Sequence, residues 1–141
     1  MSNTAHEHYM RGMTLFGEGE HIAAEDAYRQ ALVAQPKWTE AMHGLAMTLM
    51  HQGRLEDAIT VGKEITEIDD GDPFAHTSLS IFYQRQSAIA EEKGDKQAAT
   101  DLIAEAEKSG AQARLLSWKQ ELRSNPDAPK PDLPEGMDVI Q

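Results

Sequence analysis

The chain has 141 residues, of which 40% are hydrophobic and 26% are charged, a balance typical of one globular domain. Its 24 acidic and 13 basic side chains give a net charge of −11, which disfavours nucleic acid and anionic lipid surfaces as partners. We expect no transmembrane helix, because apolar runs are short, and no secretory signal in the chain as given. Cysteine is absent, so disulfides and thiolate metal sites are excluded, and we expect a cytoplasmic location.

Small and apolar residues recur along the chain with a period of 34 residues. Four of them, Gly12, Leu15, Gly19 and Ala24, return as Ala46, Leu49, Gly53 and Ala58. A third copy begins in the same register and then slips by seven residues, so that Gly53 recurs as Gly94. A repeat of this length predicts an array of helical pairs, each of which buries its apolar face against its neighbours.

Each pair is expected to contain two helices joined by a glycine turn. The first pair covers about residues 4–17 and 20–34, and the second covers about 38–52 and 55–68. Asp72 and Pro73 form a typical N-cap and first helical position for the third pair. The seven extra residues near 86–93 are helix formers, so they predict a longer first helix in that pair.

A separate last helix is expected over residues 111–123, after Gly110. Ala111, Leu115, Trp118 and Leu122 form one apolar stripe on it, so we interpret it as a helix that caps the third pair. Residues 125–141 hold four of the six prolines, and we expect a flexible tail that is dispensable for folding. The predicted domain therefore covers residues 1–124.

The repeat units resemble those of the tetratricopeptide repeat family. The matching positions are Gly12, Ala24, Tyr28, Ala31 and Pro36 in the first unit and Leu45, Ala46, Leu49 and Ala58 in the second. The resemblance covers residues 5 to about 110 and departs from the family pattern at His8, Arg11, Gly62 and Asp70. It implies an all-α fold, a right-handed α-solenoid of three helix-turn-helix units at about 5–38, 39–72 and 73–110, followed by the capping helix.

The resemblance also implies a concave groove lined by the first helix of each unit. The candidate peptide-binding residues are Tyr9, Met13, Phe16, His43, Met47, Met50, Phe74 and Ile81, with Thr77 and Gln84 beside the last of them. The positions between helices are already filled by residues such as Ala46 and Leu49, which favours an open surface for the larger apolar side chains. Two alternatives remain: the methionines fill space in the core, or the tail covers the groove.

No motif of catalysis, phosphate binding or metal binding stands out, so we expect no enzymatic activity, no metal and no cofactor. The sequence favours a non-catalytic protein-interaction module that binds an apolar or amphipathic peptide or helix. The acidic surface favours partners with basic residues beside their apolar anchors. The alternatives are a self-associating scaffold such as a homodimer, and a secretion-type chaperone of the same family.

Overall fold

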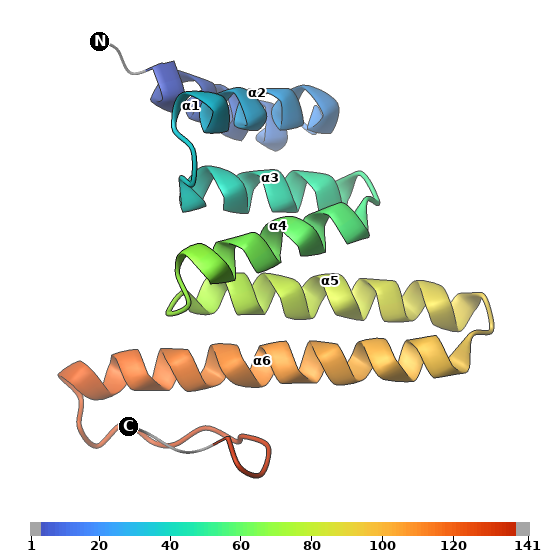
Figure 1. Ribbon diagram of the computed structural model, residues 1–141, viewed down its shortest axis with the longest axis vertical. Coiled ribbons are helices and arrows are strands. Elements are labelled where there is room, and N and C mark those ends of the chain that lie inside the picture. Colours follow the sequence, from blue (N-terminus) through green and yellow to red (C-terminus); the bar gives the residue numbers. More distant parts are fainter. Residues whose placement is uncertain (1–3, 138–141) are drawn as a thin grey trace. The chain divides into compact units, whose positions relative to one another are not determined.

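The computed structural model describes residues 4–137, and within that range all regular structure is helical (Figure 1). Six helices follow one another: α1 (Thr4–Gly17), α2 (His21–Ala34), α3 (Thr39–His51), α4 (Leu55–Ile68), α5 (Pro73–Glu92) and α6 (Lys96–Ser124). They fall into two compact units, one that ends at Asp70 and one that begins at Gly71. The prediction of an all-α fold built from three helical pairs is confirmed.

The first unit contains α1 to α4, and its core is built from small side chains on α2 and larger ones on α3. Ala24, Ala27 and Ala31 of α2 and Leu49 of α3 are fully buried, and Leu45 of α3 is almost so. Small residues at i, i+3 and i+7 let the helix axes approach closely, while leucines fill the remaining space. Helix α3 contacts α1, α2 and α4, so it is the most enclosed helix of this unit.

The same glycine turn closes the first helix of each of the three pairs. Gly19, Gly53 and Gly94 all have φ near +80°, a conformation that costs glycine little because it has no Cβ. After the first helix, Gly19 N–H donates to the Phe16 carbonyl and Glu20 N–H to the Leu15 carbonyl. Equivalent pairs of hydrogen bonds surround Gly53 and Gly94. This is a Schellman motif repeated three times, so the third pair shares the turn geometry of the first two.

Tyr28 is wedged between two glycines of neighbouring helices in the first unit. Its side chain is 3% exposed, and its ring lies against Gly12 of α1 and Gly44 of α3. A Cβ placed on Gly12 would lie 2.9 Å from the ring, and one on Gly44 would lie 2.5 Å from it. Both glycines are therefore required by the close approach of the tyrosine.

The second unit contains α5 and α6, which pack along each other as a long helical hairpin (Figure 1). Helix α5 has 20 residues, compared with 14 in α1 and 13 in α3, so the predicted lengthening is confirmed. Asp72 caps α5 by accepting from Phe74 N–H at 2.9 Å, with Pro73 in the first turn, as the sequence predicts. Two buried serines join the helices: Ser80 Oγ donates to the Ala106 carbonyl and Ser87 Oγ to the Ala99 carbonyl, both at 2.8 Å.

The predicted helix break at Gly110 is wrong. Helix α6 runs without interruption for 29 residues, so the expected capping helix over 111–123 is the C-terminal part of α6. Gly110 faces α5, where an added Cβ would lie 3.4 Å from Ser80 Oγ. The glycine therefore serves a close contact between helices, and the helix formers on both sides carry α6 through it.

The segment after α6 is irregular, as expected, but it packs against the helix. Ala128 is 7% exposed, and its carbonyl accepts from Trp118 Nε1 at 3.1 Å. Arg114 Nε donates to the Asp132 carbonyl at 3.0 Å. Residues 125–137 therefore contact α6, which corrects the expectation of a tail without contacts, while its dispensability for folding stays a prediction; residues 138–141 lie outside the described range.

Candidate functional site

A hollow of about 290 Å³ lies on the first unit and brings together four of the predicted groove residues. Its lining residues come from α1, α2 and α3, and they are Tyr9, Phe16, Tyr28, Glu40, His43, Gly44 and Met47. Of these, Tyr9, Phe16, His43 and Met47 are the positions that the repeat register selects. The hollow is mostly apolar, and its polar groups include the Glu40 carboxylate and the His43 imidazole.

Two other predicted residues of the first unit lie elsewhere. Met13 is on α1 and is 45% exposed, but it does not line the hollow. Met50 is only 6% exposed and belongs to the core, contrary to the prediction of a groove position. The reason lies in the enclosure of α3, which contacts three other helices of the unit and whose last residues, Thr48 and Leu49 among them, are buried.

An aromatic cluster forms one wall of the hollow. The Tyr9 ring centroid lies 6.0 Å from that of Tyr28 and 4.7 Å from that of Trp38. Trp38 Nε1 also donates to Glu40 Oε1 at 3.4 Å, so the indole helps to orient the carboxylate. Burial, and to a smaller extent the neighbouring Tyr9, raise the pKa of the Tyr28 hydroxyl, so that hydroxyl is neutral at physiological pH.

Phe16 connects the hollow to a pair of stacked histidines. Its ring meets His21 and His51 edge-on, with centroid distances of 5.3 and 5.2 Å. The two imidazoles stack at 4.9 Å with an angle of 11° between their planes. This packing holds the Phe16 ring in place and gives the site a rigid aromatic end.

Tyr28, Glu40 and Gly44 also line the hollow, although the sequence does not predict them as lining residues. Glu40 could have been found, because Glu40, His43 and Met47 are spaced i, i+3 and i+7 and so share one face of α3. Tyr28 and Gly44 could not, because they reach the hollow through a close packing that only the folded unit creates.

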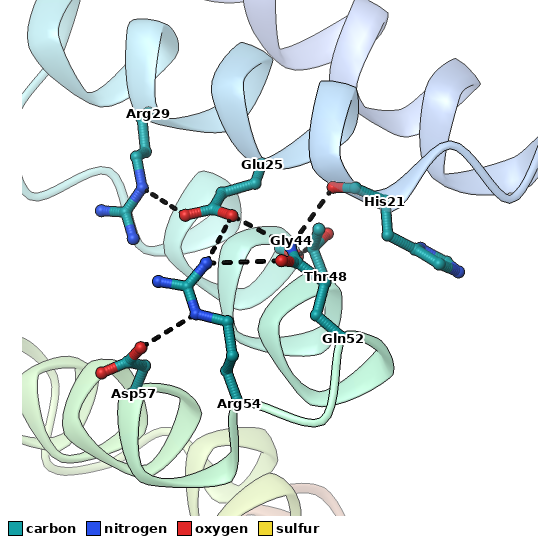
Figure 2. Close-up of polar contacts among 8 residues, drawn as sticks. All are labelled: His21, Glu25, Arg29, Gly44, Thr48, Gln52, Arg54 and Asp57. Carbon is teal, nitrogen blue, oxygen red and sulfur yellow. Dashed lines mark hydrogen bonds and ion pairs between the residues drawn. The ribbon is translucent and has the colours of Figure 1, made fainter.

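A polar network anchors α2 to the turn between α3 and α4, as Figure 2 shows. Glu25 accepts from Arg29 Nε at 2.8 Å, from Gln52 Nε2 at 2.9 Å and from Arg54 Nη1 at 2.8 Å. Arg54 Nε in turn pairs with Asp57 at 3.0 Å. The Glu25 side chain is only 14% exposed, so these contacts are better shielded from water than a typical surface ion pair.

Burial alone would raise the pKa of Glu25, but hydrogen bonds from Gln52 and Arg29 and the charges of Arg29 and Arg54 lower it overall. A carboxyl whose pKa is lower when folded stabilises the fold above its ordinary pKa, and that contribution is lost as the pH falls. We therefore expect Glu25→Gln to cost about 1–2 kcal/mol at pH 7. Its difference in unfolding free energy from the unmodified protein should shrink as the pH drops below 4.5.

Urea unfolding of both proteins at several pH values measures this effect. Glu18→Gln is the matched control, because Glu18 is exposed at the end of the first helix. That variant should show no such pH-dependent difference. A constant gap between Glu25→Gln and the unmodified protein from pH 7 to pH 3 would contradict the role assigned to the network.

The groove positions of the third pair lie in the second unit. Thr77, Ile81 and Gln84 line a cleft of about 490 Å³, whose other wall is formed by α6 and by two prolines of the tail. Phe74, at the start of α5, is 73% exposed and lies outside this cleft. The second unit thus has a surface hollow of its own, partly walled by residues 125–137.

Repeated helical pairs with identical turns and an apolar hollow define a helical-repeat protein. The family model described as tetratricopeptide repeat matches residues 9–73, which run from α1 to the start of α5, so this part of the chain is similar to the tetratricopeptide repeat family. The photosystem I assembly protein Ycf3 of Synechococcus sp. (strain CC9605) is 25% identical over 128 residues, which cover 89% of this chain and 69% of that protein. This similarity supports a protein-interaction module.

Among residues 4–137, no group of three or more histidine or acidic side chains is placed to hold a metal ion. No helix in the same range combines the length and the apolar character needed to cross a bilayer.

Proposed function

We propose that this chain is a non-catalytic module that binds an apolar or amphipathic segment of another protein in the hollow of the first unit. The observation that carries this proposal is the convergence of Tyr9, Phe16, His43 and Met47 on one hollow. These four side chains come from α1 and α3, and Tyr9 and His43 occupy equivalent positions of the two repeat units. An apolar hollow with a few polar groups is the usual form of a site that accepts an anchoring side chain.

The polar groups of the hollow favour a partner with a basic residue beside its apolar anchor. Glu40 offers a carboxylate held by Trp38, and the faces of Tyr9 and Tyr28 lie nearby. A Lys or Arg side chain can pair with that carboxylate while it lies against an aromatic ring. The net charge of −11 attracts such a segment at long range.

A role in the assembly of a larger complex is a second candidate, favoured by the relative from Synechococcus, whose name describes an assembly protein. The two candidates are compatible, because an assembly factor holds a segment of a subunit before that subunit is placed. Self-association is the alternative in which the occupant is a second copy of this chain. Light scattering at increasing protein concentration tests self-association. A molar mass that stays at the monomer value at every concentration would rule it out.

We expect Met47→Glu to abolish capture of partner proteins from the native lysate, because a carboxylate in the hollow loses its water when a partner binds. Met10→Glu is the matched control: Met10 is an exposed methionine of α1, 47% accessible and outside the hollow. That variant should retain every captured protein. Equal capture by Met47→Glu and the unmodified protein would reject the hollow as the binding site.

A further inference from the structure

The segment after α6 turns back along the helix that precedes it, and two side chains of α6 hold its backbone (Figure 1). Trp118 Nε1 donates to the Ala128 carbonyl at 3.1 Å, and Arg114 Nε donates to the Asp132 carbonyl at 3.0 Å. Arg114 is itself oriented by an ion pair with Glu107 at 3.1 Å. The two donors lie one helical turn apart and so face the same side of α6.

Trp118 and Arg114 contact main-chain atoms of a proline-rich segment. Prolines at 126, 129, 131 and 134 remove backbone N–H groups, so this stretch cannot form a helix or an inner strand. Proline keeps its carbonyl oxygen, so the stretch can still accept hydrogen bonds, and the Ala128 carbonyl belongs to the peptide bond that precedes Pro129. Aromatic grooves with an N–H donor are a general way to hold such extended segments.

Shape supports the same interpretation. Ala128 is 7% exposed, so its small side chain fits a place that a larger one would not fill without displacement. Pro129 and Pro131 line the 490 Å³ cleft together with Ile81 of α5 and Trp118 of α6. The segment therefore acts as one wall of the cleft, and its removal would expose that face of α5 and α6.

We propose that the face of α6 around Arg114 and Trp118 is a second binding site, which accepts extended proline-containing segments of partner proteins. Residues 125–137 of the chain occupy it as an internal competitor. The inference stands on contacts within the second unit and does not depend on the hollow of the first. Its ligand is a segment with a small residue before a proline and a carbonyl acceptor about four residues further on.

The internal segment has a charge that favours its exchange. Residues 125–137 contain three acidic side chains and one basic one, in a chain whose net charge is −11. An incoming segment with neutral or basic flanks meets less repulsion from this chain than its own tail does. A tethered competitor has an effective concentration in the millimolar range, so most sites are occupied by it at any time. The apparent affinity for the incoming segment equals its intrinsic affinity multiplied by the fraction of sites that are open.

The test uses a fluorescein-labelled peptide with the sequence of residues 125–137 and three full-length proteins. In Ala128→Asp a charge replaces the buried methyl group, which should release the internal segment. We expect the peptide to bind this variant about tenfold more tightly than the unmodified chain. The third protein carries Trp118→Phe, which keeps a ring but removes the N–H donor, in addition to Ala128→Asp. It should bind the peptide about fivefold more weakly than Ala128→Asp alone. Fluorescence anisotropy measures all three.

Two controls make every outcome decisive. Glu135→Ala changes an exposed residue of the segment and should leave peptide binding as in the unmodified chain. A peptide with glycine at the places of Pro129 and Pro131 should bind less tightly. The Trp118 indole N–H resonance reports whether Ala128→Asp releases the segment. Release without peptide binding would overturn the proposal, and so would an indole resonance that does not move at all.

Discussion

Replacement of Tyr28 by alanine is expected to destabilise the first unit by about 3–5 kcal/mol, the usual cost of deleting a buried aromatic ring. The ring is 3% exposed and fills the space between Gly12 and Gly44, neither of which has a side chain to fill the cavity left behind. Tyr28→Phe keeps the ring and should cost much less, about 1 kcal/mol. Urea unfolding followed by circular dichroism measures both variants.

A double-mutant cycle with Gly44→Ala tests the wedge directly. Alanine in a helix interior is normally favoured over glycine by about 1 kcal/mol. In the unmodified protein the new Cβ would meet the Tyr28 ring at 2.5 Å, so Gly44→Ala should destabilise by about 1–3 kcal/mol. In the Tyr28→Ala background the obstacle is gone, and Gly44→Ala should become stabilising. Additive effects of the two substitutions would show that the ring and the glycine do not constrain each other.

The helical pairs could be predicted from the sequence because their signals are local. Gly19, Gly53 and Gly94 mark turns whose φ near +80° is a property of the backbone itself, and the structure has all three. The wrong prediction of a helix break at Gly110 also comes from relying on a local signal. A glycine in a sequence indicates either a turn or a close contact, and only the packing of α6 on Ser80 decides between them.

The candidate site was predictable to the extent that it follows the repeat. Tyr9 and His43 occupy equivalent positions of neighbouring helices and both line the hollow, whereas Phe16 and Met47 line it without their equivalents Met50 and Met13. Met50 shares that register but is buried, since its exposure depends on which other helices cover α3. Repeat position therefore predicts the direction of a side chain but not what covers it.

The tail could not be predicted for a different reason. The proline-rich composition correctly indicates that residues 125–137 form no helix. A segment without helix can still pack against its neighbours, and composition does not indicate whether it does. The bond between Trp118 Nε1 and the Ala128 carbonyl joins a side chain to a backbone atom, and such a bond leaves no pattern in hydropathy. Proline-rich segments near an amphipathic helix are thus candidates for internal ligands even where they lack apolar side chains.

The largest effect is expected for Ala46→Glu, which should cost at least about 3–5 kcal/mol because it buries an unpaired charge. Ala46 is 1% exposed in the middle of α3, where the helix is most enclosed. Its neighbour Met47 is only half-buried and lines the hollow of the first unit. A glutamate at that position can reach water, and its helix propensity is close to that of methionine, so Met47→Glu should cost less than about 1 kcal/mol.

The comparison depends on two adjacent residues that receive the same new side chain, so helix propensity and net charge change almost equally. Thermal unfolding of the two variants side by side measures the difference, and Ala46→Glu should melt far below Met47→Glu. With a typical domain stability of about 5–15 kcal/mol, the Ala46 variant is expected to be marginally folded at best. If Met47→Glu melts as early as Ala46→Glu, the Met47 side chain is part of the core. The hollow would then be a packing defect rather than a surface open to a partner.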